Sequence, residues 1–173
     1  MSAVDLRDKV RDVPDFPKEG IVFKDLMPLI ADREAFRASI DQLAAWAQPR
    51  KPDVVLGAEA RGFIFGGALA YAIGCGFVPA RKPGKLPGQT VDATYQLEYG
   101  TDTLEVHADA IGSGARVVVL DDVLATGGTA RAKIDLVEKL GGVVVGAAFV
   151  IELTFLHGRE RLQGYDVHAL IDY

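Results

Sequence analysis

Two successive segments of the chain share one pattern, in which a short apolar run precedes a helix and a second apolar run follows it. Strands that are apolar on both sides belong to parallel sheets, whose two faces are covered by helices. Two such units in series therefore predict an α/β fold, with an open, mostly parallel sheet flanked by helices. The predicted elements are a strand at Asp53–Ala58, a helix from Arg61, strands at Phe77–Arg81 and Arg116–Leu120, a helix at Thr129–Leu140 and a strand at Val143–Ile151.

Outside these units the sequence predicts one further helix, a loop and a pair of strands. Asp32–Gln48 carries apolar residues at spacings of three and four, which predicts a helix capped by Asp32. Arg81–Thr94 is rich in proline, glycine and lysine and has no periodicity, so we expect a long mobile loop. Tyr95–Gly100 and Thr103–Ala108 alternate and predict a hairpin-like pair. A length of 173 residues fits a single domain.

The composition and charge of the chain exclude several classes of protein. A net charge of −5 disfavours a basic surface for nucleic acid and, at first sight, an anionic ligand. The single cysteine, Cys75, cannot form an internal disulfide, and Met1–Val10 is charged where a signal peptide would be apolar. We therefore expect a protein of the reducing cytoplasm.

The uncharged stretch Gly62–Ala80 is 19 residues long, which is close to the length that spans a bilayer. Five glycines and Pro79 interrupt it, and Gly74 lies where a buried helix would end before a strand. A buried helix followed by a strand is therefore preferred to a membrane span.

The segment Val117–Ala130 carries the clearest functional signal. Asp121 and Asp122 follow an apolar strand, and Thr126–Thr129 then lead into the N-terminus of a helix. Glycines let backbone N–H groups converge on an anion, which the helix dipole also favours, whereas carboxylates suit sugar hydroxyls or a hydrated magnesium ion. The segment thus predicts a sugar-phosphate site, although a tight turn with two capping aspartates is the structural alternative. The ATP-binding loop and the G-x-G-x-x-G motif are both absent from the sequence.

The sequence VVVLDDVLATGGTA resembles the motif of type I phosphoribosyltransferases that binds phosphoribosyl pyrophosphate (PRPP). Four other segments make the chain similar to the adenine phosphoribosyltransferases from Phe16 to Ile171. They are GIVFKDLMPLI (Gly20–Ile30), GAEARGFIFG (Gly57–Gly66), RKPGKLPG (Arg81–Gly88) and YQLEYG (Tyr95–Gly100). Met27 departs from the family, which often has a small hydroxyl residue there.

The resemblance implies that adenine and PRPP react to give AMP and pyrophosphate, as in purine salvage, with Mg²⁺ held mainly through PRPP and water and no direct protein ligand. It implies the type I fold with a small N-terminal hood, roughly 1–35, on a core of roughly 36–173. It also implies a homodimer that binds these small molecules and neither nucleic acid nor membrane. The implied PRPP-binding residues are Asp121 and Asp122 for the ribose; Ala125, Thr126, Gly127, Gly128 and Thr129 for the 5′-phosphate; and Glu59, Ala60, Arg61, Arg81, Lys82 and Lys85 for the pyrophosphate.

Two of these groups have structural alternatives. The turn Glu59–Gly62 often contains a non-proline cis peptide in the family, and Arg61 is expected to act in catalysis, but Arg61 could instead form a surface salt bridge. The basic loop residues suit a lid that closes over pyrophosphate, and a plain solvated loop would look the same. The segment Ala60–Val91 holds four basic and no acidic residues, so we expect a local basic patch in an acidic protein.

The resemblance makes Glu98 the general acid/base that removes a proton from the attacking purine, whereas its place on an alternating strand is equally that of an exposed side chain. The backbone groups of Val22 and Lys24 would read the adenine edge, and Phe23 would lie against the ring while also packing in the core. The alternatives are a phosphoribosyltransferase for another purine base and a non-catalytic regulator that senses PRPP or purines. A regulator would need a DNA-binding module, and the sequence before the first core strand contains no basic cluster.

Overall fold

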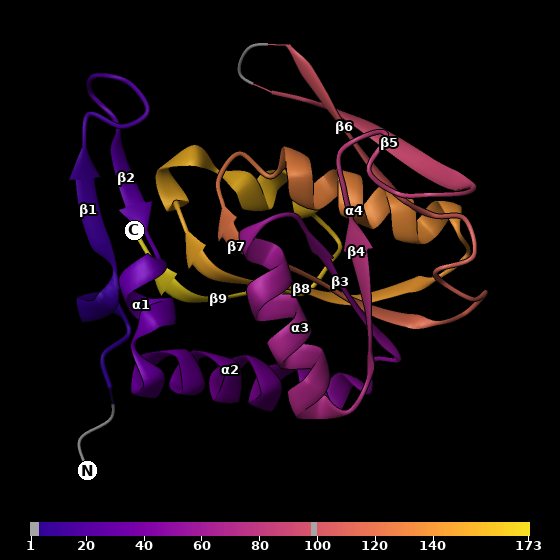
Figure 1. Ribbon diagram of the computed structural model, residues 1–173, viewed down its shortest axis with the longest axis horizontal. Coiled ribbons are helices and arrows are strands. Elements are labelled where there is room, and N and C mark those ends of the chain that lie inside the picture. The colour runs from indigo at the N-terminus through magenta and orange to yellow at the C-terminus, as the bar shows by residue number, and fades with distance from the viewer. Residues whose placement is uncertain (1–3, 98–99) are drawn as a thin grey trace. The chain divides into compact units, whose positions relative to one another are not determined.

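A computed structural model describes residues 4–97 and 100–173 of the chain (Figure 1). The chain divides into two compact units, one up to Gln42 and one from Leu43 to Tyr173, and each is described by itself. The single domain with a hood of roughly 1–35 remains a prediction.

The larger unit is built on a five-stranded sheet in which every neighbouring pair of strands is parallel (Figure 1). The order across the sheet is β4-β3-β7-β8-β9. The strands are β3 Val54–Ala58, β4 Gly76–Ala80, β7 Arg116–Leu124, β8 Val143–Glu152 and β9 Val167–Asp172. The predicted α/β fold with a parallel sheet is confirmed.

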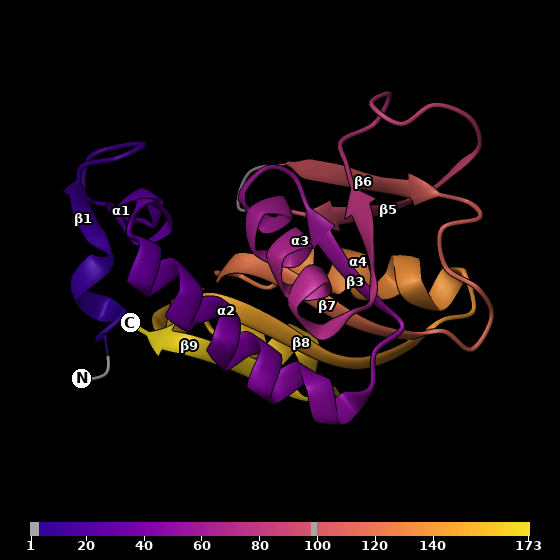
Figure 2. The ribbon, with the colours of Figure 1, turned by 60° about the horizontal axis from the view of Figure 1, so that its bottom comes forward.

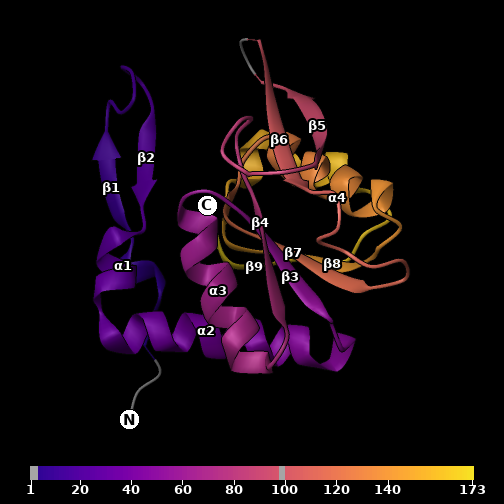
Figure 3. The same ribbon diagram turned by 45° about the vertical axis from the view of Figure 1, so that its right-hand side comes forward.

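Two helices cover opposite faces of this sheet: α3 (Arg61–Ile73) lies on one face and α4 (Gly128–Lys139) on the other (Figure 3). The helix α3 ends at Gly74, which adopts φ +73°, a left-handed conformation that glycine tolerates. Apolar side chains of β7 and α4, including Val117, Val119 and Ile134, are wholly buried in the core. The burial of both sheet faces explains why the strands are continuous apolar runs.

The strand order places a topological switch point between β3 and β7. From β3 the chain crosses to β4 on one side of β3, and β7 then enters on the other side, beside Val54–Gly57. Ligands of open α/β sheets bind at the carboxyl ends of the strands at such a point. The residues that follow β3 and those that end β7 therefore mark the candidate site.

The strand β7 is longer than the predicted strand Arg116–Leu120, because it continues through Asp121 and Asp122 to Leu124. The extension is paired: Asp121 lies opposite Phe149 and Leu124 opposite Glu152 of β8. Asp121 and Asp122 therefore lie within the strand and not after its end, since the partner strand continues to supply hydrogen bonds beyond the apolar run.

An antiparallel hairpin of β5 (Thr90–Gln96) and β6 (Thr101–His107) lies over α4, on the side away from the main sheet (Figure 2). The predicted loop Arg81–Thr94 is therefore too long, because Thr90 already pairs with His107. Ala93 and Leu104 are buried on the inner face of the hairpin. The proline and glycine residues directly before β5 obscure this alternation in the sequence.

The remaining helices are short, except for α2. The N-terminal unit contains the 3-10 helix η1 (Arg7–Lys9), a hairpin of β1 (Arg11–Pro14) and β2 (Val22–Asp25), the helix α1 (Met27–Ala31) and the start of α2 (Arg33–Ala47). Asp32 Oδ1 accepts hydrogen bonds from the N–H groups of Glu34 and Ala35, both at 3.0 Å, so the predicted cap is confirmed. The larger unit also contains η2 (Gln48–Arg50), η3 (Thr154–Leu156) and η4 (Gly158–Leu162). Among the described residues, no helix has the length and apolar character that a membrane span requires.

Candidate active site

Two adjacent aspartates near the end of β7 form the centre of the site. Asp121 and Asp122 are both buried, and each faces a different cation. Asp121 Oδ2 accepts a hydrogen bond of 2.6 Å from Nζ of Lys133, on α4. Asp122 Oδ2 lies 2.5 Å from Nε of Arg61, at the start of α3. The switch point thus joins two carboxylates with one cation from each flanking helix.

Burial and the charge of Asp121 together raise the pKa of Asp122 to about 6, and Arg61 and Lys133 offset only part of this effect. The Asp122 Oδ2 atom is buried and faces the Arg61 guanidinium, with which it forms the ion pair. An ionised carboxylate has about four acceptor sites, so Asp122 can accept a hydrogen bond from a hydroxyl group in addition to this ion pair. The arrangement therefore suits a polyhydroxyl ligand.

The raised pKa of Asp122 predicts how stability depends on pH. The folded protein holds this proton up to about pH 6, whereas an unfolded aspartate loses it near pH 4. The folded state therefore binds more protons between these values, and its stability falls as the pH rises through them, by roughly 3 kcal/mol for this group. We expect Asp122→Asn to remove this loss, so that the variant gains stability relative to the wild type between pH 4 and pH 7.5. Denaturant unfolding at both pH values measures the change.

The matched control is Asp102→Asn. Burial opposes ionisation of Asp102, but the hydrogen bond from Lys82 and further donors outweigh it and lower the pKa. Because its lowered pKa places this titration below that of an unfolded aspartate, near pH 4, the stability difference between Asp102→Asn and the wild type is expected to change little between pH 4 and pH 7.5. If the difference between Asp122→Asn and the wild type is the same at both pH values, Asp122 does not titrate as described.

The turn after β3 lies beside the aspartates. Its Glu59–Ala60 peptide bond is cis, as the resemblance predicts. Gly62 packs so closely against β7 that an added Cβ atom would lie 2.7 Å from Asp121 Oδ1. The turn that follows one strand therefore contacts the carboxylate of its neighbour.

Ala125–Gly127 connects β7 to α4, and Gly128 and Thr129 are the first two residues of the helix. Gly127 adopts φ +85° and precedes the first residue of the helix. An added Cβ atom at Gly127 would lie 2.5 Å from the carbonyl oxygen of Gly158, at the start of η4. The segment after β8 therefore packs against the loop and restricts its position. The first N–H groups of α4 have no partner within the helix. This geometry suits the binding of a phosphate group.

Each of the three basic loop residues has a carboxylate partner. Glu59 accepts hydrogen bonds from Arg81 Nη2 at 3.2 Å, from Lys85 Nζ at 3.1 Å and from the backbone N–H of Lys82 at 2.7 Å. Burial raises the pKa of Glu59, but these donors outweigh it and lower the pKa to about 2. The Lys82 ammonium pairs with Asp102, which also accepts a hydrogen bond of 3.2 Å from Tyr95.

These pairs correct the expectation of a local basic patch. Arg61 pairs with Asp122, so all four basic residues of the segment 60–91 contact carboxylates that lie outside that segment. Arg61 accordingly forms an ion pair, which is the structural alternative considered for it, but its partner is a buried aspartate of the candidate site. The ion pair therefore belongs to the candidate site.

The other predicted residues lie elsewhere. Glu98 falls outside the described residues. Val22, Phe23 and Lys24 belong to the N-terminal unit: the Val22 side chain is exposed, the Phe23 ring packs edge-on against Phe16 at 5.2 Å, and Lys24 Nζ lies 2.6 Å from Asp12. The role of these three residues in reading adenine stays a prediction.

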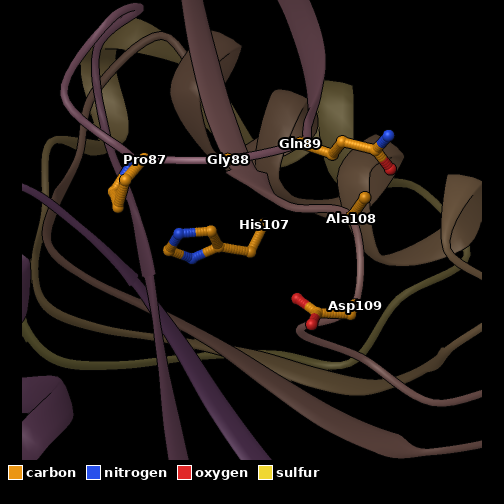
Figure 4. Close-up of a pocket in the computed structure, with 6 residues that line it drawn as sticks. All are labelled: Pro87, Gly88, Gln89, His107, Ala108 and Asp109. Atoms are coloured by element: carbon orange, nitrogen blue, oxygen red, sulfur yellow. The ribbon is translucent and has the colours of Figure 1, made fainter.

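A cavity of about 400 Å³ lies at the end of the β5–β6 hairpin where Thr90 pairs with His107 (Figure 4). The imidazole of His107 points toward Pro87, and the side chain of Gln89 points away from it (Figure 4). Gly128 contacts the opposite end of the hairpin, near Gln96. The residues that line the cavity, Pro87, Gly88, Gln89, His107, Ala108 and Asp109, include none of the predicted site residues.

Sequence reasoning missed three residues that support the site: Lys133, Asp102 and Gly158. Lys133 lies within a segment whose apolar spacing predicts only a helix, so it was not singled out. A lysine between Ala132 and Ile134 on a buried helix nevertheless indicates a buried charge that needs a partner. Asp102 and Gly158 carry no local signal, because their partners Lys82 and Ala125 are distant in the sequence.

Comparison with known proteins identifies the family. The model of the phosphoribosyl transferase domain matches residues 30–170. An adenine phosphoribosyltransferase from Desulfitobacterium hafniense is 56% identical over 173 residues, which is 100% of both chains. The chain belongs to the adenine phosphoribosyltransferase family. As a member of this family it is an enzyme of the pentosyltransferase class.

Solved adenine phosphoribosyltransferases have the same fold. The crystal structure from Thermoanaerobacter pseudethanolicus matches with a TM-score of 0.95 and 54% identity, over 97% of this chain and 98% of that one. The enzyme from Saccharomyces cerevisiae, solved with adenine and an imino-altritol bisphosphate, matches with a TM-score of 0.91 and 42% identity, over 95% of this chain and 96% of that one. The type I phosphoribosyltransferase fold is thereby confirmed.

Proposed function

We propose that this chain transfers the 5-phosphoribosyl group of PRPP to adenine, which gives AMP and pyrophosphate in purine salvage. The observation that carries the proposal is the buried Asp121–Asp122 pair, which two residues separate from the loop at the N-terminus of α4. A ligand that satisfies both features needs hydroxyl groups next to a phosphate, and the 5-phosphoribosyl group has both. The choice of adenine as the base is based on the relatives, which are named adenine phosphoribosyltransferase.

Each part of the site binds a different part of PRPP. Asp121 and Asp122 accept hydrogen bonds from the ribose hydroxyls. The residues Ala125 to Thr129 bind the 5′-phosphate through backbone N–H groups and the two threonine hydroxyls. The turn Glu59–Arg61 and the loop cations Arg81, Lys82 and Lys85 bind the pyrophosphate. Holding PRPP at both ends fixes the anomeric carbon, and Arg61 then stabilises the charge that develops on the leaving pyrophosphate.

The residues fit a magnesium ion that is held mainly by PRPP and water. Magnesium usually binds through one or two carboxylates, waters and substrate phosphates, and the buried Asp122 carboxylate can accept a hydrogen bond from one of those waters. When bound, magnesium neutralises charge on the pyrophosphate.

The backbone groups of Val22 and Lys24 read the adenine edge and Phe23 packs on its ring. Glu98 takes the proton that adenine loses as the glycosidic bond forms, which offsets the positive charge on the base. We also propose that the enzyme is a cytoplasmic homodimer, as family membership implies.

An assay of the purified protein with PRPP, magnesium and a panel of bases tests the proposal. AMP is expected from adenine, while hypoxanthine, guanine and xanthine give little or no nucleotide. Turnover of another base in preference to adenine would assign that base, and PRPP binding without turnover of any base would indicate a regulator. In the same assay, Glu98→Gln is expected to lower turnover much more than it weakens binding of either substrate. Turnover equal to the wild type would remove the acid/base role.

A further inference from the structure

Lys133 is a fully buried lysine on α4, with 0% of its side chain exposed. Its ammonium donates one hydrogen bond of 2.6 Å to Asp121 Oδ2 and another of 3.0 Å to the carbonyl oxygen of Leu120. Both acceptors belong to β7. Lys133 therefore connects α4, which begins after the loop Ala125–Gly127, to β7, the strand that carries the two aspartates.

Packing alone does not require a lysine at this position. The neighbouring side chains of α4 in the core, Ala130, Ile134 and Val137, are apolar and buried. Removing an ammonium group from water costs several kcal/mol, and a buried ion pair is often no more stabilising than apolar residues of the same volume. A methionine would fill the same space without this cost, so the charge of Lys133 points to a function.

The contact with Lys133 fixes the orientation of the Asp121 carboxylate. Lys133 holds Oδ2, while Oδ1 accepts a hydrogen bond of 3.1 Å from the N–H of Asp122 and lies against Gly62. The second cation of the site, Arg61, contacts Asp122 and has 39% of its side chain exposed. Of the two ion pairs in the site, the one between Lys133 and Asp121 is therefore buried and fixed. A ligand can reach the other, between Arg61 and Asp122, because the Arg61 side chain is partly exposed.

We propose that Lys133 is a positioning residue for PRPP: it holds the Asp121 carboxylate in the orientation that the ribose requires, and it connects the loop before α4 to that carboxylate through α4. The inference rests on the proposed function, because it assigns Asp121 to the ribose. Lys133 itself does not touch the substrate. Its effect on PRPP must therefore pass through Asp121, and this can be measured.

A double-mutant cycle between Lys133 and Asp121 tests the inference. The dissociation constant for PRPP with magnesium is measured by calorimetry for the wild type, Lys133→Met, Asp121→Asn and the double variant. Lys133→Met is expected to weaken PRPP binding by about 10- to 100-fold, within the range of coupling between contacting residues. In the Asp121→Asn background the same substitution is expected to change the constant by less than about threefold. The KM for PRPP should rise accordingly, with kcat and the KM for adenine changing much less.

The matched control is Lys139→Met. Lys139 lies on the same helix, but its Nζ donates a hydrogen bond to the backbone carbonyl oxygen of Asp92 on β5. This variant is expected to bind PRPP as the wild type does. All variants are compared well below their midpoints of thermal unfolding. The neutral double variant, Asp121→Asn with Lys133→Met, leaves no buried charge at this contact and provides a folded reference if Lys133→Met alone is unstable.

The outcomes separate the two proposals. If Asp121→Asn binds PRPP as the wild type does, the ribose assignment is wrong. If Asp121→Asn weakens binding but Lys133→Met does not, the ribose assignment stands and the role of Lys133 is overturned. Equal losses from Lys133→Met in both backgrounds would also overturn it, because they would show an effect that does not pass through Asp121.

Discussion

Replacing both Asp121 and Asp122 with asparagine is expected to weaken PRPP binding by at least about 100-fold. Hydrogen bonds to charged groups contribute about 1.5–3 kcal/mol each, so the loss of two carboxylates removes about 3–6 kcal/mol. The loss is expected in the binding of PRPP and not in the binding of adenine. Calorimetric titration of each ligand, with magnesium present, measures the two effects separately.

The double substitution also disturbs the fold, because loss of the Asp121 carboxylate leaves the Lys133 ammonium buried without an anionic partner. Asp122→Asn alone avoids this problem, since the partially exposed Arg61 can turn toward solvent. It is expected to lose about 10- to 100-fold in PRPP affinity while remaining folded. Asp135→Asn, at a partly exposed position of α4, is the control and should bind normally. Wild-type affinity in folded Asp122→Asn would remove this residue from the ribose site.

The main sheet could be predicted from the sequence because its physical cause is local. A strand covered on both faces must be apolar throughout, as Val117–Leu120 is. The end of α3 is also local, because Gly74 readily adopts the left-handed conformation that ends a helix. The end of β7 could not be predicted in this way. Asp121 and Asp122 break the apolar run, but the strand continues because β8 still pairs with it up to Glu152.

The charge of the site could not be predicted because ion pairs join residues that are distant in the sequence. The segment 60–91 is basic taken alone, yet Asp102 and Asp122 come from β6 and β7, and Glu59 precedes the segment. The fold brings these carboxylates to the cations. Net charge within a stretch of sequence therefore says little about the field at a site where several strands meet.

The pattern of ion pairs distinguishes fixed from exchangeable charges. The side chains of Arg81, Lys82 and Lys85 are 34–49% exposed, and ion pairs of that kind contribute little to stability. Under the proposed function, an incoming pyrophosphate competes with Glu59 and Asp102 for these cations at small cost. The buried pair of Lys133 and Asp121 is not open to such exchange. The loop can thus change partners while the carboxylates that bind the ribose stay in place.

Gly127→Ala is the second substitution with a large expected effect. Gly127 has φ +85°, which costs about 1–2 kcal/mol for a residue with a Cβ atom. That atom would also lie 2.5 Å from the Gly158 carbonyl oxygen, so the backbone of the loop must move. Because the loop binds the 5′-phosphate through backbone N–H groups, its displacement is expected to lower kcat/KM for PRPP by about 100-fold or more, as small misplacements of a binding group do.

Gly74→Ala provides the matched control, because it separates conformational strain from displacement of the loop. Gly74 also has a positive φ, +73°, but an added Cβ atom there meets nothing within 4 Å. Both variants should therefore lose stability in thermal unfolding, whereas only Gly127→Ala should lose activity with PRPP. Steady-state kinetics with varied PRPP at saturating adenine measure this difference. Equal kcat/KM in the two variants would mean that the loop before α4 does not hold the phosphate, since the contact of Gly127 with Gly158 is what sets its position.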